Sequence, residues 1–128
     1  MIRVAIDTNR LTDLFKGDRL LSEQLAGCDE ILIPLIVIAE LKAGFYAGSA
    51  AVRNDRLLQA FLGKPAVTPV LPDLNTAELY GRLYAQLRKA GTPIPANDLW
   101  IGCLTLQHGA RLITRDKHFQ RIPHLLTA

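Results

Sequence analysis

The sequence predicts an α/β fold built on a central parallel sheet with helices on both faces. Short apolar segments rich in strand-forming residues alternate along the chain with longer segments of helical spacing. The strand segments are apolar throughout, so neither face of the sheet is expected to contact water. The 128 residues contain no internal repeat, low-complexity tract or linker. We therefore expect a single domain over residues 1–128.

Capping residues and glycines indicate where the helices expected in the first half of the chain begin and end. Gly17 ends a short first helix, and Asp18 is a suitable N-cap for a second helix that Gly27 ends. Gly63 follows the last helix of this half. In order, the expected elements are a strand at 2–6, helices at 11–15 and 19–26, a strand at 31–33, and helices at 35–47 and 51–62.

The second half continues the alternation of strands and helices. Asn75 and Glu78 have the spacing of a capping box, which predicts that a helix starts there. Gly109 closes the helix that follows. The sequence leaves open whether Leu125 and Leu126 form an edge strand. In order, the expected elements are a strand at 67–71, helices at 75–90 and 98–108, and a strand at 111–114.

Composition and charge narrow the class of protein. The net charge of +3 and pI near 9.1 favour an acidic partner only weakly. The longest apolar run, 31–39, contains Pro34 and is too short for a membrane span. No signal-peptide pattern opens the chain, and Cys28 and Cys103 lack metal-binding spacing. We therefore expect a cytoplasmic protein with two reduced thiols and no membrane contact.

Two aspartates follow strand segments directly. Asp7 comes after the first strand, and Asp116 comes just after the last. Open parallel sheets carry their sites at the carboxyl ends of the strands, where both residues are expected. An Asx-turn or a helix cap would explain either residue equally well on its own.

Two further acids lie in apolar helical segments. Glu40 is surrounded by the segment IPLIVIAELKAGF, and Asp98 opens the apolar segment DLWIGCLTL. A carboxylate in such surroundings is costly unless it is paired or binds a metal, although Asp98 also suits a helix first turn. Gathered at one edge of the sheet with Asp7 and Asp116, these acids would repel one another unless cations neutralised them. Oxygen ligands of this kind select Mg²⁺ or Mn²⁺ over zinc.

The segments that contain these acids resemble the motifs of the PIN-domain family. They are AIDTN at the start, AELKAG about a third of the way along, and ANDLWIG and LITRDKHF near the end. Their order and spacing are similar to those of the toxin ribonucleases of VapBC-type toxin–antitoxin pairs, and the resemblance spans essentially the whole chain. It implies a three-layer α/β/α sandwich with a central parallel sheet, in agreement with the pattern of elements.

The resemblance also implies a role for each acid, with all of them catalytic. Asp7, Asp98 and Asp116 would bind the metal ion, and Glu40 would coordinate it or hold the attacking water. The supporting positions, where the family has hydroxyl or amide groups that hold the acids and bound waters, are Thr8, Asn9 and Thr114.

The implied activity is that of a Mg²⁺-dependent endoribonuclease, with Mn²⁺ as a substitute. A metal-activated water would attack a phosphodiester of structured RNA such as tRNA or rRNA. Basic side chains would bind the flanking phosphates, and the candidates are Arg10, Arg82, Arg111, Arg115, Lys117 and Arg121.

The implied partners are a small antitoxin protein and a second copy of the chain, in a homodimer or a toxin–antitoxin hetero-oligomer. Two alternatives to a toxin remain open. One is a PIN-domain nuclease that processes RNA without being a toxin. The other is a catalytically silent PIN-like module that binds RNA or a protein, which EDTA would not affect.

Overall fold

The protein is built on one parallel sheet with helices packed around it. The computed structural model describes all 128 residues. The strands are β1 (Arg3–Ile6), β2 (Glu30–Pro34), β3 (Val67–Val70) and β4 (Arg111–Ile113), in the spatial order β3-β2-β1-β4. The helices are α1 (Thr8–Phe15), α2 (Arg19–Ala26), α3 (Leu35–Ala47), α4 (Ala51–Leu62), α5 (Leu74–Lys89), α6 (Ala96–Gln107) and the 3₁₀ helix η1 (Lys117–Arg121).

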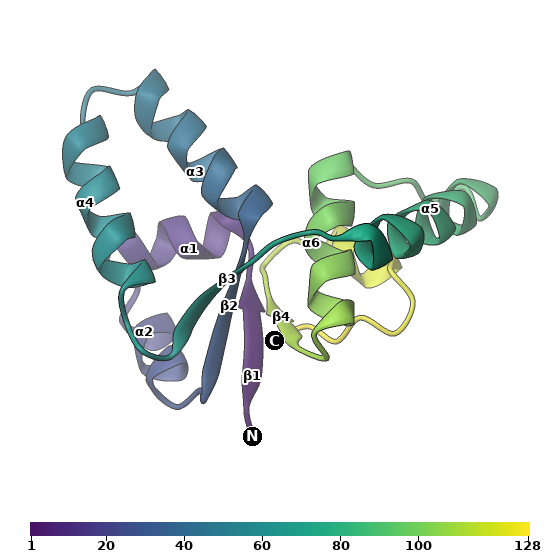
Figure 1. Cartoon of the computed structure of the whole chain (residues 1–128), viewed down its shortest axis with the longest axis horizontal. Helices are drawn as coiled ribbons and strands as arrows, with labels where there is room; N and C mark the ends of the chain where they lie inside the picture. Colours follow the sequence, from purple (N-terminus) through teal and green to yellow (C-terminus); the bar gives the residue numbers. More distant parts are fainter.

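The sheet is the middle layer of three. Helices α1 to α4 lie on one side of it, and α5 and α6 lie on the other (Figure 1). A continuous core of 27 buried side chains joins these layers. The central strands β1 and β2 are apolar because both of their faces are covered, whereas Thr68 and Pro69 of the edge strand β3 are exposed. The predicted three-layer α/β/α sandwich with a central parallel sheet is confirmed.

Strand register decides which residues meet at the edge of the sheet. The first strand, β1, lies between β2 and β4, and all neighbours run parallel. Ile6 is opposite Ile113, and the N–H of Asp7 donates to the carbonyl of Ile113 over 3.2 Å. The residues after β1 and β4, Asp7 and Thr114, therefore lie side by side although 107 positions separate them.

The two outer strands protect their edges in different ways. In β3, Pro69 is tolerated because an edge strand has no second neighbour that needs its N–H. Beside β4, the N–H of Leu112 donates to the carbonyl of Leu126, and the N–H of Ala128 donates to Leu112, each over 2.8 Å. The C-terminal residues thus continue the sheet in parallel, through a single bridge between Leu112 and Thr127.

Most element boundaries agree with the sequence prediction, and α3 and α4 agree to the residue. The first helix begins at Thr8 instead of residue 11, because Asp7 caps it. The capping box of α5 is formed by Asp73 and Thr76, so the prediction that Asn75 caps this helix is wrong. The last α-helix begins at Ala96, two residues before the predicted start.

The two cysteines are free thiols, as expected. Cys103 is buried, and burial raises the pKa of its thiol to about 11. None of the helices combines the length and the apolar character that crossing a membrane requires.

Candidate active site

Acidic side chains from distant parts of the chain gather at the carboxyl-terminal edge of the sheet. They line a cavity of about 130 Å³. The structure brings all of the predicted acids together here, and the lining residues are Asp7, Thr8, Asn9, Glu40, Asp98, Asp116 and Phe119.

Asp7 is the most buried of these acids, with 4% of its surface exposed. It leaves the end of β1 and caps α1, where one carboxylate oxygen accepts the N–H of Arg10 over 2.9 Å. The other oxygen accepts the hydroxyl of Thr114. The same Thr114 hydroxyl oxygen accepts the N–H of Asp116 over 3.0 Å, so it links the acids that follow β1 and β4.

Glu40 lies in the middle of α3 and is half-buried. The hydroxyl of Thr8 donates to one of its oxygens over 2.6 Å. The side-chain amide of Asn97, from the first turn of α6, lies 3.4 Å from the other oxygen. The Glu40 carboxylate is therefore oriented by polar groups from α1 and α6. Asn9 lines the same cavity and is exposed, with no side-chain hydrogen bond.

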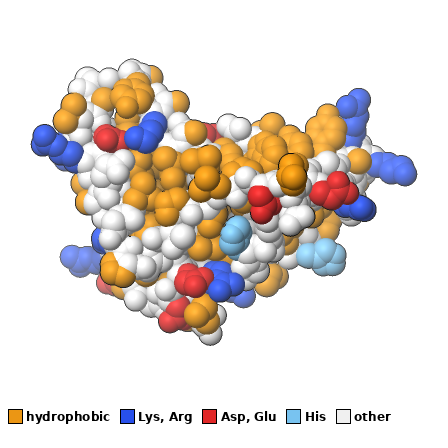
Figure 2. All heavy atoms as spheres, viewed as in Figure 1, with side chains coloured by type: hydrophobic (Ala, Val, Ile, Leu, Met, Phe, Trp, Pro, Cys, Tyr) orange, Lys and Arg blue, Asp and Glu red, His pale blue; other side chains and the backbone are white.

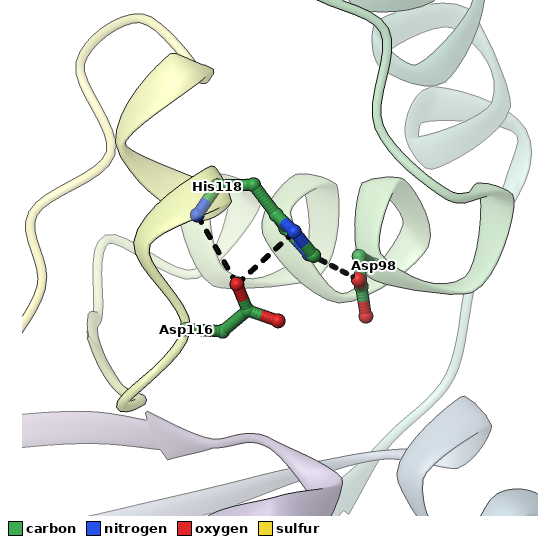
Figure 3. A group of neighbouring side chains, drawn as sticks. All are labelled: Asp98, Asp116 and His118. Carbon is green, nitrogen blue, oxygen red and sulfur yellow. Dashed lines mark hydrogen bonds and ion pairs between the residues drawn. The ribbon is translucent and has the colours of Figure 1, made fainter.

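His118 lies between Asp98 and Asp116 (Figure 3). Its Nε2 is 2.6 Å from Oδ2 of Asp98, and its Nδ1 is 3.0 Å from Oδ1 of Asp116. Asp98 comes from the first turn of α6, whereas Asp116 caps η1 and accepts the N–H of His118 over 3.2 Å. The imidazole therefore joins two acids that come from different elements.

The surroundings of the cavity oppose the ionisation of Asp7 and Asp98. Burial raises the pKa of Asp7, the hydrogen bonds from Thr114 and Arg10 lower it in part, and the charges of Asp98 and Asp116 raise it again. Burial likewise raises the pKa of Asp98 against the lowering effect of His118, with Asp116 and Glu40 adding to the rise. No Lys or Arg forms an ion pair with any of these carboxylates.

This donor set suits a divalent cation. Carboxylate oxygens are the ligands that hard cations such as Mg²⁺ and Mn²⁺ prefer. A cation bound among Asp7, Asp98 and Asp116 would favour the charged carboxylates, against the burial and the mutual repulsion that raise the pKa of Asp7 and Asp98. The residues present therefore fit the metal ion that the chemistry of the cavity calls for.

Arg10 and Arg115, which were predicted to bind phosphates, both form ion pairs with Asp13. Arg10 is half-buried, and its Nη1 lies 3.0 Å from Asp13 and 3.1 Å from Asp18. Arg115 donates from Nε to the same Asp13 carboxylate over 3.0 Å. These contacts lower the pKa of Asp13, with Arg115 having the largest effect. The ion pair between Arg115 and Asp13 holds the segment that follows β4 against α1.

The other predicted basic residues differ in their settings. Arg82 pairs with Glu78 one turn earlier on α5, and Arg121 donates to a backbone carbonyl before α6 over 3.0 Å. Lys117 begins η1 next to the cavity, is exposed and forms no ion pair. Arg111 begins β4 and so lies at the opposite end of the sheet from the acids, because the strands are parallel. The structure therefore does not bring Arg111 to the edge where the acids lie.

Sequence reasoning missed three side chains of the site. Asn97 contacts Glu40, Phe119 lines the cavity, and His118 contacts two acids. The position of Asn97 next to Asp98 was an available signal. The histidines match no metal-binding motif in the sequence, so the contact of His118 with Asp98 across 20 positions had no local signal.

Comparison with known protein families identifies this arrangement. The model of the PIN domain matches residues 4–125, nearly the whole chain. The chain belongs to the PIN-domain family. PIN domains are metal-dependent nucleases, which agrees with the carboxylate cavity.

Relatives and solved structures support the PIN-domain assignment. The chain is 33% identical to ribonuclease VapC1 of Haemophilus influenzae (strain R2866) over 125 residues, which cover 94% of this chain and 92% of that protein. It superposes with a TM-score of 0.88 on a chain of VapBC-1 from nontypeable Haemophilus influenzae, at 30% identity, covering 99% of this chain and 97% of that one. It matches a chain of VapBC2 from Rickettsia felis, solved with a DNA fragment from its promoter, with a TM-score of 0.88, 27% identity and coverage of 99% and 98%.

Proposed function

We propose that this PIN domain is a Mg²⁺-dependent endoribonuclease that cuts structured RNA, such as tRNA or rRNA, as the growth-inhibiting toxin of a toxin–antitoxin pair. The observation that carries the proposal is the cavity in which Asp7, Glu40, Asp98 and Asp116 meet without a Lys or Arg partner. The whole chain would act as a single nuclease domain. The named relatives are ribonucleases of the VapC type.

Each acid has a proposed role in hydrolysis. Asp7, Asp98 and Asp116 would hold the Mg²⁺ ion, with Mn²⁺ as a substitute. When bound, the ion would lower the pKa of a water ligand and neutralise charge on the phosphodiester. Glu40 would hold the attacking water, and Thr8 keeps the Glu40 carboxylate oriented through the 2.6 Å hydrogen bond.

The supporting residues would fix the acids in place. Thr114 and the N–H of Arg10 hold both oxygens of Asp7, so its carboxylate has one orientation in the cavity. Asn9 is exposed at the cavity wall, where its amide would bind substrate or water. Together these groups supply the positioning that hydrolysis by a bound water requires.

Basic side chains near the cavity would bind the RNA backbone. Lys117 has no partner in the protein and is the first candidate. Arg115 and Arg121 are exposed, and their present contacts are with Asp13 and a backbone carbonyl. Such exposed contacts are weak, so phosphates would compete for both side chains. Arg10 and Arg82 would contribute to RNA binding through the attraction of their positive charge for the phosphate backbone.

An antitoxin is the proposed protein partner. The buried side of α3 is formed by Val37, Ile38 and Leu41, yet Leu35 and Tyr46 of the same helix are 42% and 74% exposed. Figure 2 shows hydrophobic side chains across the middle of this face of the molecule. The solved relatives from Rickettsia and Haemophilus are VapBC complexes. We expect this chain to form a comparable hetero-oligomer or a homodimer, in the cytoplasm.

The first test is cleavage of total cellular RNA by the purified chain. We expect discrete fragments with Mg²⁺ and none with EDTA. Asp7→Asn should abolish cleavage because it removes a charge from the proposed metal site. Glu23→Gln is the matched control, since Glu23 is an exposed acid of α2 away from the cavity, and it should cut normally.

Growth measurements test the role as a toxin. Induction of the unmodified chain should arrest growth, whereas induction of Asp7→Asn should not. Intact RNA in the presence of both Mg²⁺ and Mn²⁺ would overturn the proposed activity. Cleavage without growth arrest would instead favour a nuclease that processes RNA.

A further inference from the structure

We propose that His118 is a positioning residue that fixes Asp98 and Asp116 for cation binding. This inference rests on the proposed function, because it concerns the same metal site. The imidazole contacts one oxygen of each carboxylate, at 2.6 Å for Asp98 and 3.0 Å for Asp116 (Figure 3). It is the only side chain that contacts both acids.

Without the His118 imidazole, no side chain links the Asp98 carboxylate to the Asp116 carboxylate. Asp98 belongs to α6, and Asp116 precedes η1. No other side chain forms a hydrogen bond with the Asp98 carboxylate, and Asp116 keeps only the backbone N–H of His118 itself. An imidazole is short and rigid, and its two nitrogens point in diverging directions in the plane of the ring, so it can set the spacing of two acids.

The contacts leave one oxygen of each acid for a cation. Asp98 uses Oδ2 and Asp116 uses Oδ1 for His118, so Oδ1 of Asp98 and Oδ2 of Asp116 have no hydrogen-bond partner in the protein. Figure 3 shows these second oxygens pointing away from the imidazole. Both acids line the cavity with Asp7 and Glu40, whereas His118 does not. His118 therefore holds the pair from outside the cavity.

The position of His118 is itself fixed by packing. Its neighbour Phe119 is 1% exposed and anchors η1 in the core. The two rings lie 5.6 Å apart at a tilt of 44°. The side chain of His118 is 26% exposed, so the imidazole is enclosed enough to keep one orientation. Metal-binding groups held in this way by a second residue typically lose about 10–100-fold in affinity when that residue is removed.

The competing role for His118 is that of a direct ligand, which would bind the metal ion through a ring nitrogen. Its ring nitrogen and one oxygen from each of Asp98 and Asp116 lie within 4.8 Å of one another. A ligand would share the bound ion with these acids, whereas a positioning residue would leave the ion with oxygen ligands alone. The two roles differ in whether nitrogen is bonded to the ion, which can be measured with Mn²⁺ as the probe.

The experiment measures Mn²⁺ affinity by calorimetry for the full chain and for His118→Ala, His118→Gln and His124→Asn. We expect His118→Ala to weaken Mn²⁺ binding by at least about tenfold. His118→Gln should restore part of the affinity, because its amide can donate to Asp98 near the place of Nε2. His124→Asn is the matched control: His124 is exposed with φ of 66°, which Asn tolerates, and affinity should not change.

Pulsed electron paramagnetic resonance on the Mn²⁺-loaded chain completes the test. We expect no nitrogen coupling to the ion. A nitrogen coupling that His118→Gln removes would overturn the positioning role in favour of a ligand. Equal Mn²⁺ affinity in folded His118→Ala and the unmodified chain would also overturn it, while leaving the proposed function intact. Failure of the unmodified chain to bind Mn²⁺ would count against the proposed function itself.

Discussion

Two aspartates of the cavity serve at the same time as helix caps. Asp7 accepts the N–H of Arg10 at the start of α1, and Asp116 accepts the N–H of His118 at the start of η1. The cap and the site are therefore not alternative explanations for these residues. Because the backbone of each helix start fixes one carboxylate oxygen, the orientation of the acid is set before any ligand arrives.

The charge of Asp7 should lower the stability of the metal-free chain. Burial raises the pKa of Asp7 above its ordinary value of 3.8, so the folded chain binds this proton more tightly than the unfolded chain does. The stability that protonation supplies is complete below pH 3.8 and is lost as pH rises through the folded pKa. In EDTA at pH 7, we expect Asp7→Asn to raise the Tm, since the amide keeps the cap without the buried charge.

A pH series of thermal denaturation checks this prediction. The difference in Tm between Asp7→Asn and the unmodified chain should shrink as the pH approaches 3.8 from above. Glu23→Gln again serves as the control, and it should leave the Tm unchanged at each pH. A lower Tm for Asp7→Asn at pH 7 would show that the charge on Asp7 stabilises the fold.

The stability of the chain should depend more on the hydroxyl of Thr114 than on the volume of its side chain. The hydroxyl donates to Asp7 and accepts the N–H of Asp116. Thr114→Val keeps the volume but leaves the buried Asp7 oxygen without its donor, at a cost of about 1–3 kcal/mol. Urea denaturation measures the loss. Thr114→Ser keeps the hydroxyl and should lose less, so equal losses for both variants would assign the effect to packing.

At the scale of elements, helix starts were the least predictable feature. Asp73 and Asn75 can both cap a helix, and local sequence favoured Asn75 because Glu78 follows it at capping-box spacing. The structure selects Asp73, whose carboxylate also accepts the side-chain amide of Gln107 over 3.1 Å. That contact spans 34 positions, so it is absent from the local pattern. The ends of α3 and α4 were predictable because glycines follow both helices.

The packing of α6 against the C-terminal segment depends on Gly102. A Cβ at this position would lie 2.5 Å from Cδ1 of Ile122, which is 2% exposed. Ile122→Val removes that methyl group and should cost about 0.5–1.5 kcal/mol in the unmodified chain. In the chain that carries Gly102→Ala, the same substitution also relieves the clash, so it should cost clearly less. A double-mutant cycle by urea denaturation checks this coupling, and additivity within about 0.5 kcal/mol would contradict it.

At the scale of the whole molecule, the positions of the acids in the fold could be predicted from the sequence, but the side chains that contact them could not. Asp7 and Asp116 could be placed at one edge because parallel strands end together, and the register of β1 and β4 confirms that placement. The same rule places Arg111, the first residue of β4, at the other end of the sheet, away from the acids. The role of His118 depends on how η1 packs against α6, which strand order does not determine.

Binding of a divalent cation should stabilise the whole molecule. Mg²⁺ at a hundred times its Kd adds about 2.7 kcal/mol to the free energy of unfolding, if the unfolded chain does not bind it. For a chain of 128 residues this corresponds to a rise in Tm on the order of 10 °C. A thermal-shift titration measures it. Asp98→Asn should lose most of the rise, and an equal rise in that variant would place the ion elsewhere.

The central position of β1 has a consequence for synthesis of the chain. Asp7, which follows β1, is made 107 positions before Thr114, which follows the neighbouring strand β4. A nascent chain that still lacks its final segment has Asp7 and Glu40 but neither the fourth acid nor the hydroxyl that holds the first. The proposed metal site can therefore assemble only after β4 and Asp116 have been synthesised, although the strand that carries Asp7 is made far earlier.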